Sequence, residues 1–137
     1  MKTIFINGVY HEYNNIGGII YELESNNIQI GKNIIIGDSV RLESNIIIKD
    51  NCTIGYKSKI GKESILGNNI TIGRNVDIGY GVTIEDNVEI YGHITIGDKT
   101  TIKSNVTING GECLFYKIKI KHNSIINNNI TINTEKK

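Results

Sequence analysis

The chain of 137 residues contains no proline and no tryptophan, and it has only two cysteines and three histidines. Cys52 and Cys113 form no CxxC motif, so the sequence offers neither a disulfide framework nor a cysteine-based metal site. The net charge of +1 creates no field that favours nucleic acid or an anionic membrane surface. The first apolar run, at residues 4–6, is too short for a signal peptide, and no stretch approaches a membrane span. We therefore expect one soluble, cytoplasmic domain with no nucleic-acid or membrane partner.

Isoleucine and asparagine are abundant instead. The β-branched side chain of isoleucine favours strands. Asparagine favours tight turns, because it tolerates a left-handed backbone better than most residues. Together these two residue types indicate many short strands joined by many tight corners.

An internal repeat of six residues runs through most of the chain. Counted from Ile30 in steps of six, all 18 positions up to Ile132 are isoleucine or leucine. Such a fixed period is the signature of a repeat architecture. No insertion or deletion shifts the phase of this run, so the sequence predicts an uninterrupted prism of stacked coils.

The other positions of each hexad are ordered around the aliphatic residue, position i. Position i+1 is often glycine, position i+3 is usually asparagine or glycine, and position i+4 is usually small or branched. Because side chains alternate across a strand, positions i and i+4 should point inward. Position i+3 should turn the corner in the left-handed conformation. Each hexad is then one short strand and one corner.

This pattern resembles the hexapeptide repeat of left-handed parallel β-helix proteins, and it covers residues 30–133. The resemblance implies an all-β, single-stranded, left-handed helix in which three hexads make one triangular coil. Eighteen hexads then give about six coils. The resemblance also implies a homotrimer with parallel axes. The family that the pattern resembles includes acyltransferases and zinc carbonic anhydrases.

The chain ends depart from the repeat and divide the sequence into three parts. Residues 1–27 are predicted to be a small β cap, with a hairpin around Asn7-Gly8 and a second turn at residues 14–18. Such a cap covers the exposed strand edge of the first coil. Residues 28–133 are the β-helix, and residues 134–137 are a charged tail.

Residues 18 apart should stack in columns along the prism. One outward column is predicted to run from Gln29 through Ile47 and Ile65 to Lys119, while Ile125 should lie on another face. Neighbouring exposed isoleucines suggest a subunit interface, so Ile47 and Ile65 are the candidate contacts of the homotrimer. A small anionic ligand is expected in the clefts between subunits.

The histidines His11, His93 and His122 are too widely separated in the repeat for a zinc site, so no metal is expected. Column spacing instead places Arg74, His93 and Glu112 on one edge, with Tyr91 beside them. In the acyltransferase interpretation His93 is the base, Glu112 orients it and Arg74 contacts an anionic group. In the structural interpretation His93 only turns a corner, because histidine tolerates the left-handed slot.

Two departures from the acyltransferase pattern favour a function without catalysis. Those enzymes usually extend a loop from the helix to build the site, and the uninterrupted repeat contains none. Many also end in small-residue coils or a C-terminal helix that help to bind acyl-CoA, whereas the last coils here are rich in Asn, Lys and Ile. The sequence therefore favours a self-associating β-helix without a cofactor, which binds or sequesters a small ligand between subunits or serves as a rigid module. The alternative is an acyl-CoA-dependent O- or N-acetyltransferase that uses acetyl-CoA and His93.

Overall fold

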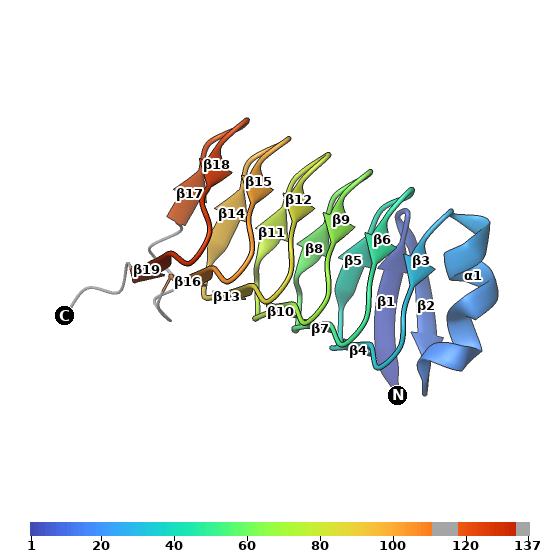
Figure 1. The fold of residues 1–137 in the computed structure, drawn as a ribbon. Coiled ribbons are helices and arrows are strands. Elements are labelled where there is room, and N and C mark those ends of the chain that lie inside the picture. Colours follow the sequence, from blue (N-terminus) through green and yellow to red (C-terminus); the bar gives the residue numbers. More distant parts are fainter. Residues whose placement is uncertain (111–117, 134–137) are drawn as a thin grey trace.

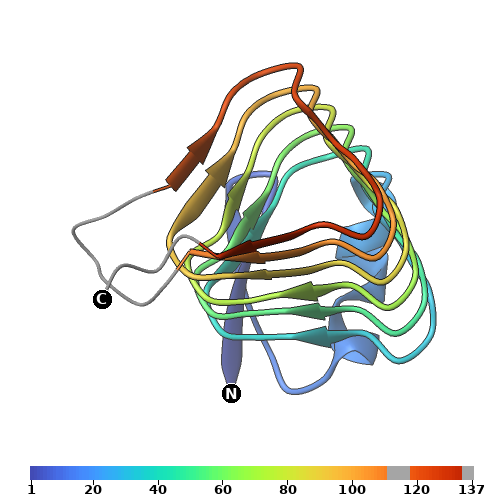
Figure 2. The ribbon, with the colours of Figure 1, turned by 60° about the vertical axis from the view of Figure 1, so that its left-hand side comes forward.

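The computed structural model describes residues 1–110 and 118–133. In these residues, 17 short strands wind around a triangular prism, which is seen from the side in Figure 1 and obliquely in Figure 2. Parallel strands stack into three sheets, here called faces A, B and C. Faces B and C contain six strands each, which confirms a prism of about six coils.

Each face collects every third strand of the chain. Face A contains β5 (Val40–Leu42), β8 (Lys59–Ile60), β11 (Asp77–Ile78), β14 (Ile94–Ile96) and β17 (Ile118–Ile120). Face B contains β3 (Gln29–Ile30), β6 (Ile47–Ile48), β9 (Ile65–Leu66), β12 (Thr83–Ile84), β15 (Thr101–Ile102) and β18 (Ile125–Ile126). Face C contains β4 (Ile35–Ile36), β7 (Thr53–Ile54), β10 (Thr71–Ile72), β13 (Glu89–Tyr91), β16 (Thr107–Asn109) and β19 (Thr131–Asn133).

The corners adopt the backbone that the repeat predicts. With one exception, every described corner of the prism has a left-handed residue in slot i+3, with φ between 57° and 64°. Asparagine is the usual occupant, but Ser39, Lys57, Glu63 and Lys99 adopt the same angle. Asparagine adds hydrogen bonds between coils, as where Asn69 Nδ2 donates to Asn87 Oδ1 at 3.1 Å. The fold therefore imposes the left-handed angle, and asparagine accommodates it best.

The core is a stack of aliphatic side chains in the inward slots. Isoleucines such as Ile54, Ile72 and Ile90 are at most 1% exposed. Burying one isoleucine contributes roughly 1.5–3 kcal/mol, which drives the stacking of successive coils. Polar residues in slot i+4 are satisfied by the next coil: Ser58 Oγ donates to Gly73 O at 2.6 Å and accepts from Val76 N at 3.1 Å.

The coil length changes once along the prism. Paired residues lie 18 apart in the earlier coils, as in the bond from Asn87 to Asn105. In the last coil they lie 24 apart, as in the bond from Asn105 to Asn129. The chain uses residues 110–117 to pass from β16 to β17, where it uses only Gly92 and His93 to pass from β13 to β14.

The prediction of an uninterrupted repeat was therefore wrong. The last coil contains six extra residues, and six is the length of one hexad. The insertion consequently leaves the phase of the aliphatic positions unchanged. Leu114, which fits the aliphatic pattern, lies outside the described residues.

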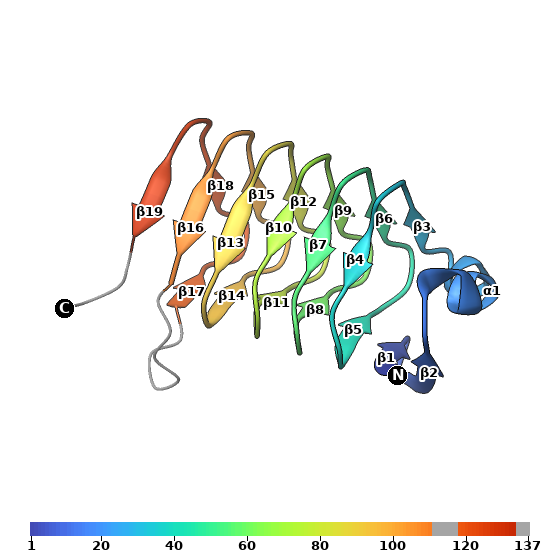
Figure 3. The same cartoon turned by 90° about the horizontal axis from the view of Figure 1, so that it is seen from below.

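The N-terminal cap consists of a hairpin and a short helix (Figure 3). Strands β1 (Lys2–Ile6) and β2 (Val9–Tyr13) pair antiparallel around Asn7 and Gly8, whose φ angles are 49° and 82°. Strand β1 also pairs in parallel with β5, so it takes the place of a coil strand on face A. Asp38 fixes the hairpin, since its Oδ1 accepts from Thr3 N at 2.7 Å and from Thr3 Oγ1 at 2.8 Å.

The second half of the cap differs from the predicted β structure. A 3₁₀ turn, η1 (Ile16–Ile19), leads into the helix α1 (Ile20–Ser25). Ile19 and Leu23 are spaced by four residues and are 2% and 1% exposed, so one side of this segment covers the first coil. Among the described helices, none has the length and apolar character needed to cross a membrane.

Candidate functional site

The corner between β13 and β14 is the exception to the regular corner geometry. Its left-handed residue is Gly92, with φ 91°, in slot i+2 rather than i+3. His93, which follows Gly92, does not have a positive φ, and its side chain is half-buried. The structural interpretation in which His93 itself takes the left-handed corner slot was therefore wrong. Glycine makes this turn, so the turn gives no reason for a histidine at position 93.

The extra residues of the last coil begin and end directly above this corner. Gly110 N donates to Tyr91 O at 2.8 Å, and Ile118 pairs with Ile94. A Cβ at Gly110 would stand 2.8 Å from Ile94 Cγ1, so glycine is needed where the chain leaves the regular coil. The described residues that flank the insertion, Gly110 and Ile118, thus contact the two neighbours of the Gly92-His93 corner, Tyr91 and Ile94. The last coil therefore uses six residues more than the repeat predicted, and residues 111–117 lie outside the described residues.

Arg74 and Tyr91 lie on the same edge, between faces C and A. Arg74 is exposed on the corner one coil below His93. A Cβ at the preceding Gly73 would stand 3.2 Å from Tyr91 Cα and 3.3 Å from Tyr91 Cδ1, so the tyrosine lies closely over this glycine. Within residues 1–110 and 118–133, no hydrogen bond or ion pair links Arg74 to His93. Glu112, the predicted orienter, lies outside the described residues.

Glu89 is a site residue that the sequence analysis did not select. Tyr91 Oη donates to Glu89 Oε1 at 3.0 Å on the outward side of β13. Partial burial and this bond to the carboxylate raise the pKa of the Tyr91 hydroxyl, which therefore stays protonated at neutral pH. The sequence feature that could have identified Glu89 is the outward column of face C. Glu89 interrupts a row of threonines there, at positions 53, 71, 107 and 131.

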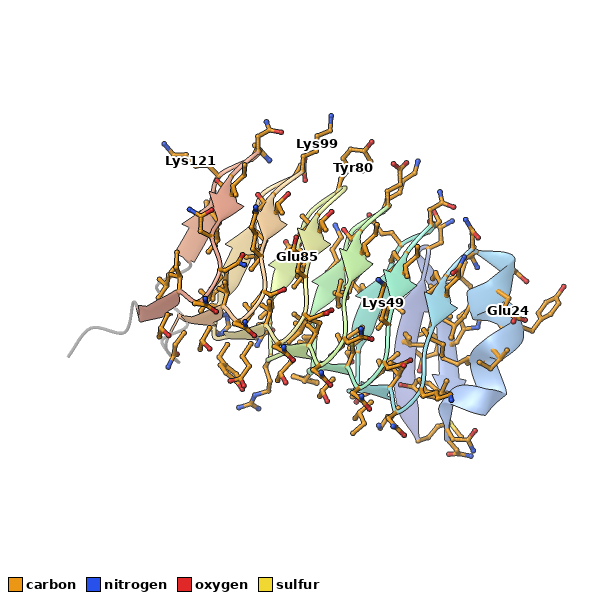
Figure 4. The ribbon with its side chains drawn as sticks, viewed as in Figure 1. Glu24, Lys49, Tyr80, Glu85, Lys99 and Lys121 are labelled. Atoms are coloured by element: carbon orange, nitrogen blue, oxygen red, sulfur yellow. The ribbon has the colours of Figure 1, made fainter. Side chains whose placement is uncertain are left out.

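The other histidines lie elsewhere. His11 is in the hairpin strand β2, and His122 Nδ1 accepts from Asp98 N at 2.7 Å on the edge between faces A and B. The same edge carries Tyr80, Lys99 and Lys121 (Figure 4). A constant period of 18 would place His122 above Ser104 instead, but the last coil is six residues longer. No cluster of three or more potential metal ligands occurs in the described parts of the chain.

The outward column of face B is more apolar than predicted. Ile47 and Ile65 are neighbours in it as expected, and Ile65 is 37% exposed. The column ends in Ile125 rather than Lys119, since Thr101 pairs with Ile125 across the longer coil. Ile125 is 66% exposed. A groove of about 350 Å³ on this face is lined in part by Gln29, Ile47 and Lys49.

Comparisons with known proteins were made by family model, by sequence and by structure. No family model matches the chain, and no curated protein matches it in sequence. Two solved structures match: variants of a perosamine N-acetyltransferase from Caulobacter crescentus, with a histidine replaced by asparagine in one and by alanine in the other. Both are complexes with CoA and GDP-perosamine.

Each structural match has 12% sequence identity and a TM-score of 0.56. The matches cover 75% and 76% of this chain and 51% of the other, so the chain spans about half the length of these neighbours. A likeness at this level of identity concerns the fold. The chain has the left-handed parallel β-helix fold of hexapeptide-repeat proteins.

Proposed function

We propose that this chain is an acyl-CoA-dependent acyltransferase that acetylates a hydroxyl or amino group, with His93 as the general base. The carrying observation is the coincidence of His93 with the six extra residues of the last coil. The resembling acyltransferases usually extend additional residues from the helix to build their site. The expected absence of such an extension was one of the reasons for favouring a function without catalysis.

The structural neighbours support the same choice. Both are N-acetyltransferase structures that contain CoA, and a histidine is the residue replaced in each. Because fold alone does not determine function, this support is an analogy. Combined with the geometry at His93, it favours the acyltransferase over a ligand-binding or purely structural module.

The proposed reaction needs one proton transfer and one acyl transfer. Neutral His93 takes the proton from the acceptor N–H or O–H, while the acceptor's lone pair attacks the thioester carbonyl carbon of acetyl-CoA. The bond between that carbon and the CoA sulfur breaks, and its electron pair leaves with the sulfur, which gains a proton to form CoA thiol. The product is an acetamide or an acetate ester. In this proposal Glu112 orients His93, and Arg74 binds an anionic group of a substrate.

The proposed enzyme assembles as a homotrimer through face B. The exposed Ile65 and Ile125 and the half-buried Ile47 support this assembly, because isoleucines in one outward column leave apolar surface in water. Packing of this column against a second copy would remove that surface from solvent. The clefts formed beside it would then be available for acetyl-CoA.

The test is release of CoA thiol from acetyl-CoA, with glucosamine and glycerol as amino- and hydroxyl-bearing acceptors. We expect His93→Ala to lower the rate by about 10²–10⁴-fold, which is the usual contribution of a general base. His11→Ala and His122→Ala are the matched controls and should stay close to the wild type. Circular dichroism and thermal unfolding check that each variant is folded.

Two results would overturn the proposal. One is a His93→Ala variant as active as the wild type. The other is no CoA release by the wild type with either acceptor, together with a small molecule that co-purifies in stoichiometric amount in native mass spectrometry. That second result would support sequestration of a ligand without catalysis.

A further inference from the structure

We propose that Tyr91 and Glu89 form an acceptor subsite that selects a ring with neighbouring hydroxyl groups, such as a sugar. This inference rests on the proposed acyltransferase function, because it assigns the acceptor class to the surface that leads into His93. It adds Glu89 as a specificity-determining residue and gives Tyr91 a defined role.

Glu89 is an unusual residue for its position. It occupies the centre of the outward column of face C, where Thr71 pairs with it on one side and Thr107 on the other. Threonine suits an exposed strand position better than glutamate does. In the described residues, no lysine, arginine or histidine forms an ion pair with Glu89, and its side chain is exposed. Neither strand preference nor charge pairing therefore explains the carboxylate.

Tyr91 holds this carboxylate in place. Its hydroxyl donates to Glu89 Oε1 at 3.0 Å, which leaves the remaining lone pairs of the carboxylate for a ligand. The tyrosine is itself fixed, since it lies over Gly73 and its carbonyl accepts from Gly110 N. At 38% exposure, part of its ring remains accessible as an apolar surface. The pair is thus positioned before any ligand arrives.

The surrounding groups fit a ligand with several hydroxyls. Thr71 and Thr107 lie one coil to either side of Glu89, at the strand spacing of about 4.8 Å. A carboxylate only accepts hydrogen bonds, whereas threonine hydroxyls both donate and accept. A carboxylate and threonine hydroxyls beside an aromatic ring can bind a ring-shaped ligand that has several hydroxyl groups at its edge and an apolar face.

The position of Glu89 and Tyr91 relative to His93 determines which part of the acceptor they would bind. Glu89 precedes His93 by four residues, and a corner separates them. Glu89 points outward on face C, and His93 lies on the adjoining edge between faces C and A. In this proposal the carboxylate contacts the acceptor beside the group that His93 activates. An acceptor that spans both points presents its nucleophile to His93 and its neighbouring hydroxyls to Glu89.

The experiment compares two amines that differ in hydroxyl groups: glucosamine and cyclohexylamine. Wild type, Glu89→Gln and Tyr91→Phe are assayed for acetyl-CoA-dependent acetylation of each amine. Each variant is compared with the wild type on the same amine, so that differences in amine reactivity cancel. Glu85→Gln is the matched control, because Glu85 is another exposed glutamate that accepts from a hydroxyl, that of Ser104 at 3.4 Å (Figure 4).

We expect Glu89→Gln to lower kcat/KM for glucosamine by about 10- to 100-fold, the usual effect of losing a hydrogen bond to a charged group. Acetylation of cyclohexylamine and the KM for acetyl-CoA should change less than about twofold. Tyr91→Phe should show the same selectivity with a smaller loss, since the carboxylate remains but is no longer held. Glu85→Gln should match the wild type. Equal losses for both amines, or no loss for either, would overturn the subsite.

A binding measurement separates this inference from the proposed function. Saturation-transfer NMR reports binding of glucosamine without any turnover, and we expect the signal to fall in Glu89→Gln but not in Glu85→Gln. If that difference appears while no variant releases CoA, the acyltransferase proposal fails and the subsite stands. If glucosamine binds wild type and Glu89→Gln alike, the subsite is refuted whatever the enzyme assay shows.

Discussion

Deletion of residues 112–117 tests the irregular coil most directly. It leaves two residues between β16 and β17, which is the number between β13 and β14. All 17 strands of the prism keep their partners, because the deleted residues lie between strands. Shortening the connection from eight residues to two lowers its closure cost by about 1 kcal/mol. We therefore expect the free energy of unfolding to change by no more than about 1 kcal/mol, or a few degrees in Tm.

The same deletion should abolish the proposed chemistry, because it removes Glu112, the proposed orienter of His93. Acetyl-CoA-dependent acetylation is expected to fall by about 10²-fold or more. Replacement of residues 112–117 by six glycine and serine residues keeps the length and serves as the matched control. It should be equally inactive and equally stable. A loss of cooperative unfolding in the deletion variant, or a loss above about 3 kcal/mol, would refute the 24-residue register.

Two further predictions concern the cap and the interface. Hydrogen bonds from Thr3 lower the pKa of the Asp38 carboxyl below its ordinary value, so the stabilisation by Asp38 is present above that ordinary value and is lost as pH falls through the lower pKa of the folded state. Hydrogen-exchange protection of the Thr3 amide should therefore fall at that low pH, and it should also fall in Asp38→Asn at neutral pH. Unchanged protection in both cases would refute the role of Asp38 in fixing the hairpin. Ile65→Lys should convert the proposed trimer to monomer in sedimentation velocity, whereas Ile35→Lys on face C should not; a trimer in both variants would exclude face B as the interface.

The fold was predictable because its physical determinants recur in every hexad. Inward aliphatic residues and left-handed corners each need only local sequence, and 18 repetitions reinforce one another. The corner at Lys57 shows why the prediction tolerates exceptions. Lysine is a poor left-handed residue, yet its φ is 59° because the coils on either side fix the backbone.

The column assignments failed in the last coil for an equally physical reason. An insertion of one hexad preserves the six-residue phase while it shifts every later strand by one face. Lys119 was assigned to a column by a period of 18, but it belongs to a coil with a period of 24. The sequence contained one signal of the break. Gly110-Gly111 followed by Glu112 places a charge where every regular coil has a small or branched residue.

The helix of the cap was missed because two signals competed. Gly17-Gly18 indicates a turn, and the following residues 19–23 look like a strand when they are read alone. The spacing of Ile16, Ile19, Ile20 and Leu23 at three, four and seven residues is instead helical. Burial of Ile19 and Leu23 against the first coil settles the conformation in favour of the helix.

The position of the candidate site follows from the symmetry of the scaffold. Regular coils present equivalent surfaces, so a ligand would bind equally well at each of them. Three departures from regularity lie on or next to the edge at His93: the left-handed Gly92 in slot i+2, Glu89 in the threonine column of face C, and the insertion of six residues between Gly110 and Ile118. Gly92 and Glu89 do not improve the packing of the core, since the inward Ile90 and Ile94 are fully buried as in any other coil. Deviations from the repeat that do not improve packing are expected at functional sites. The edge at His93 is therefore the candidate site independently of any structural neighbour.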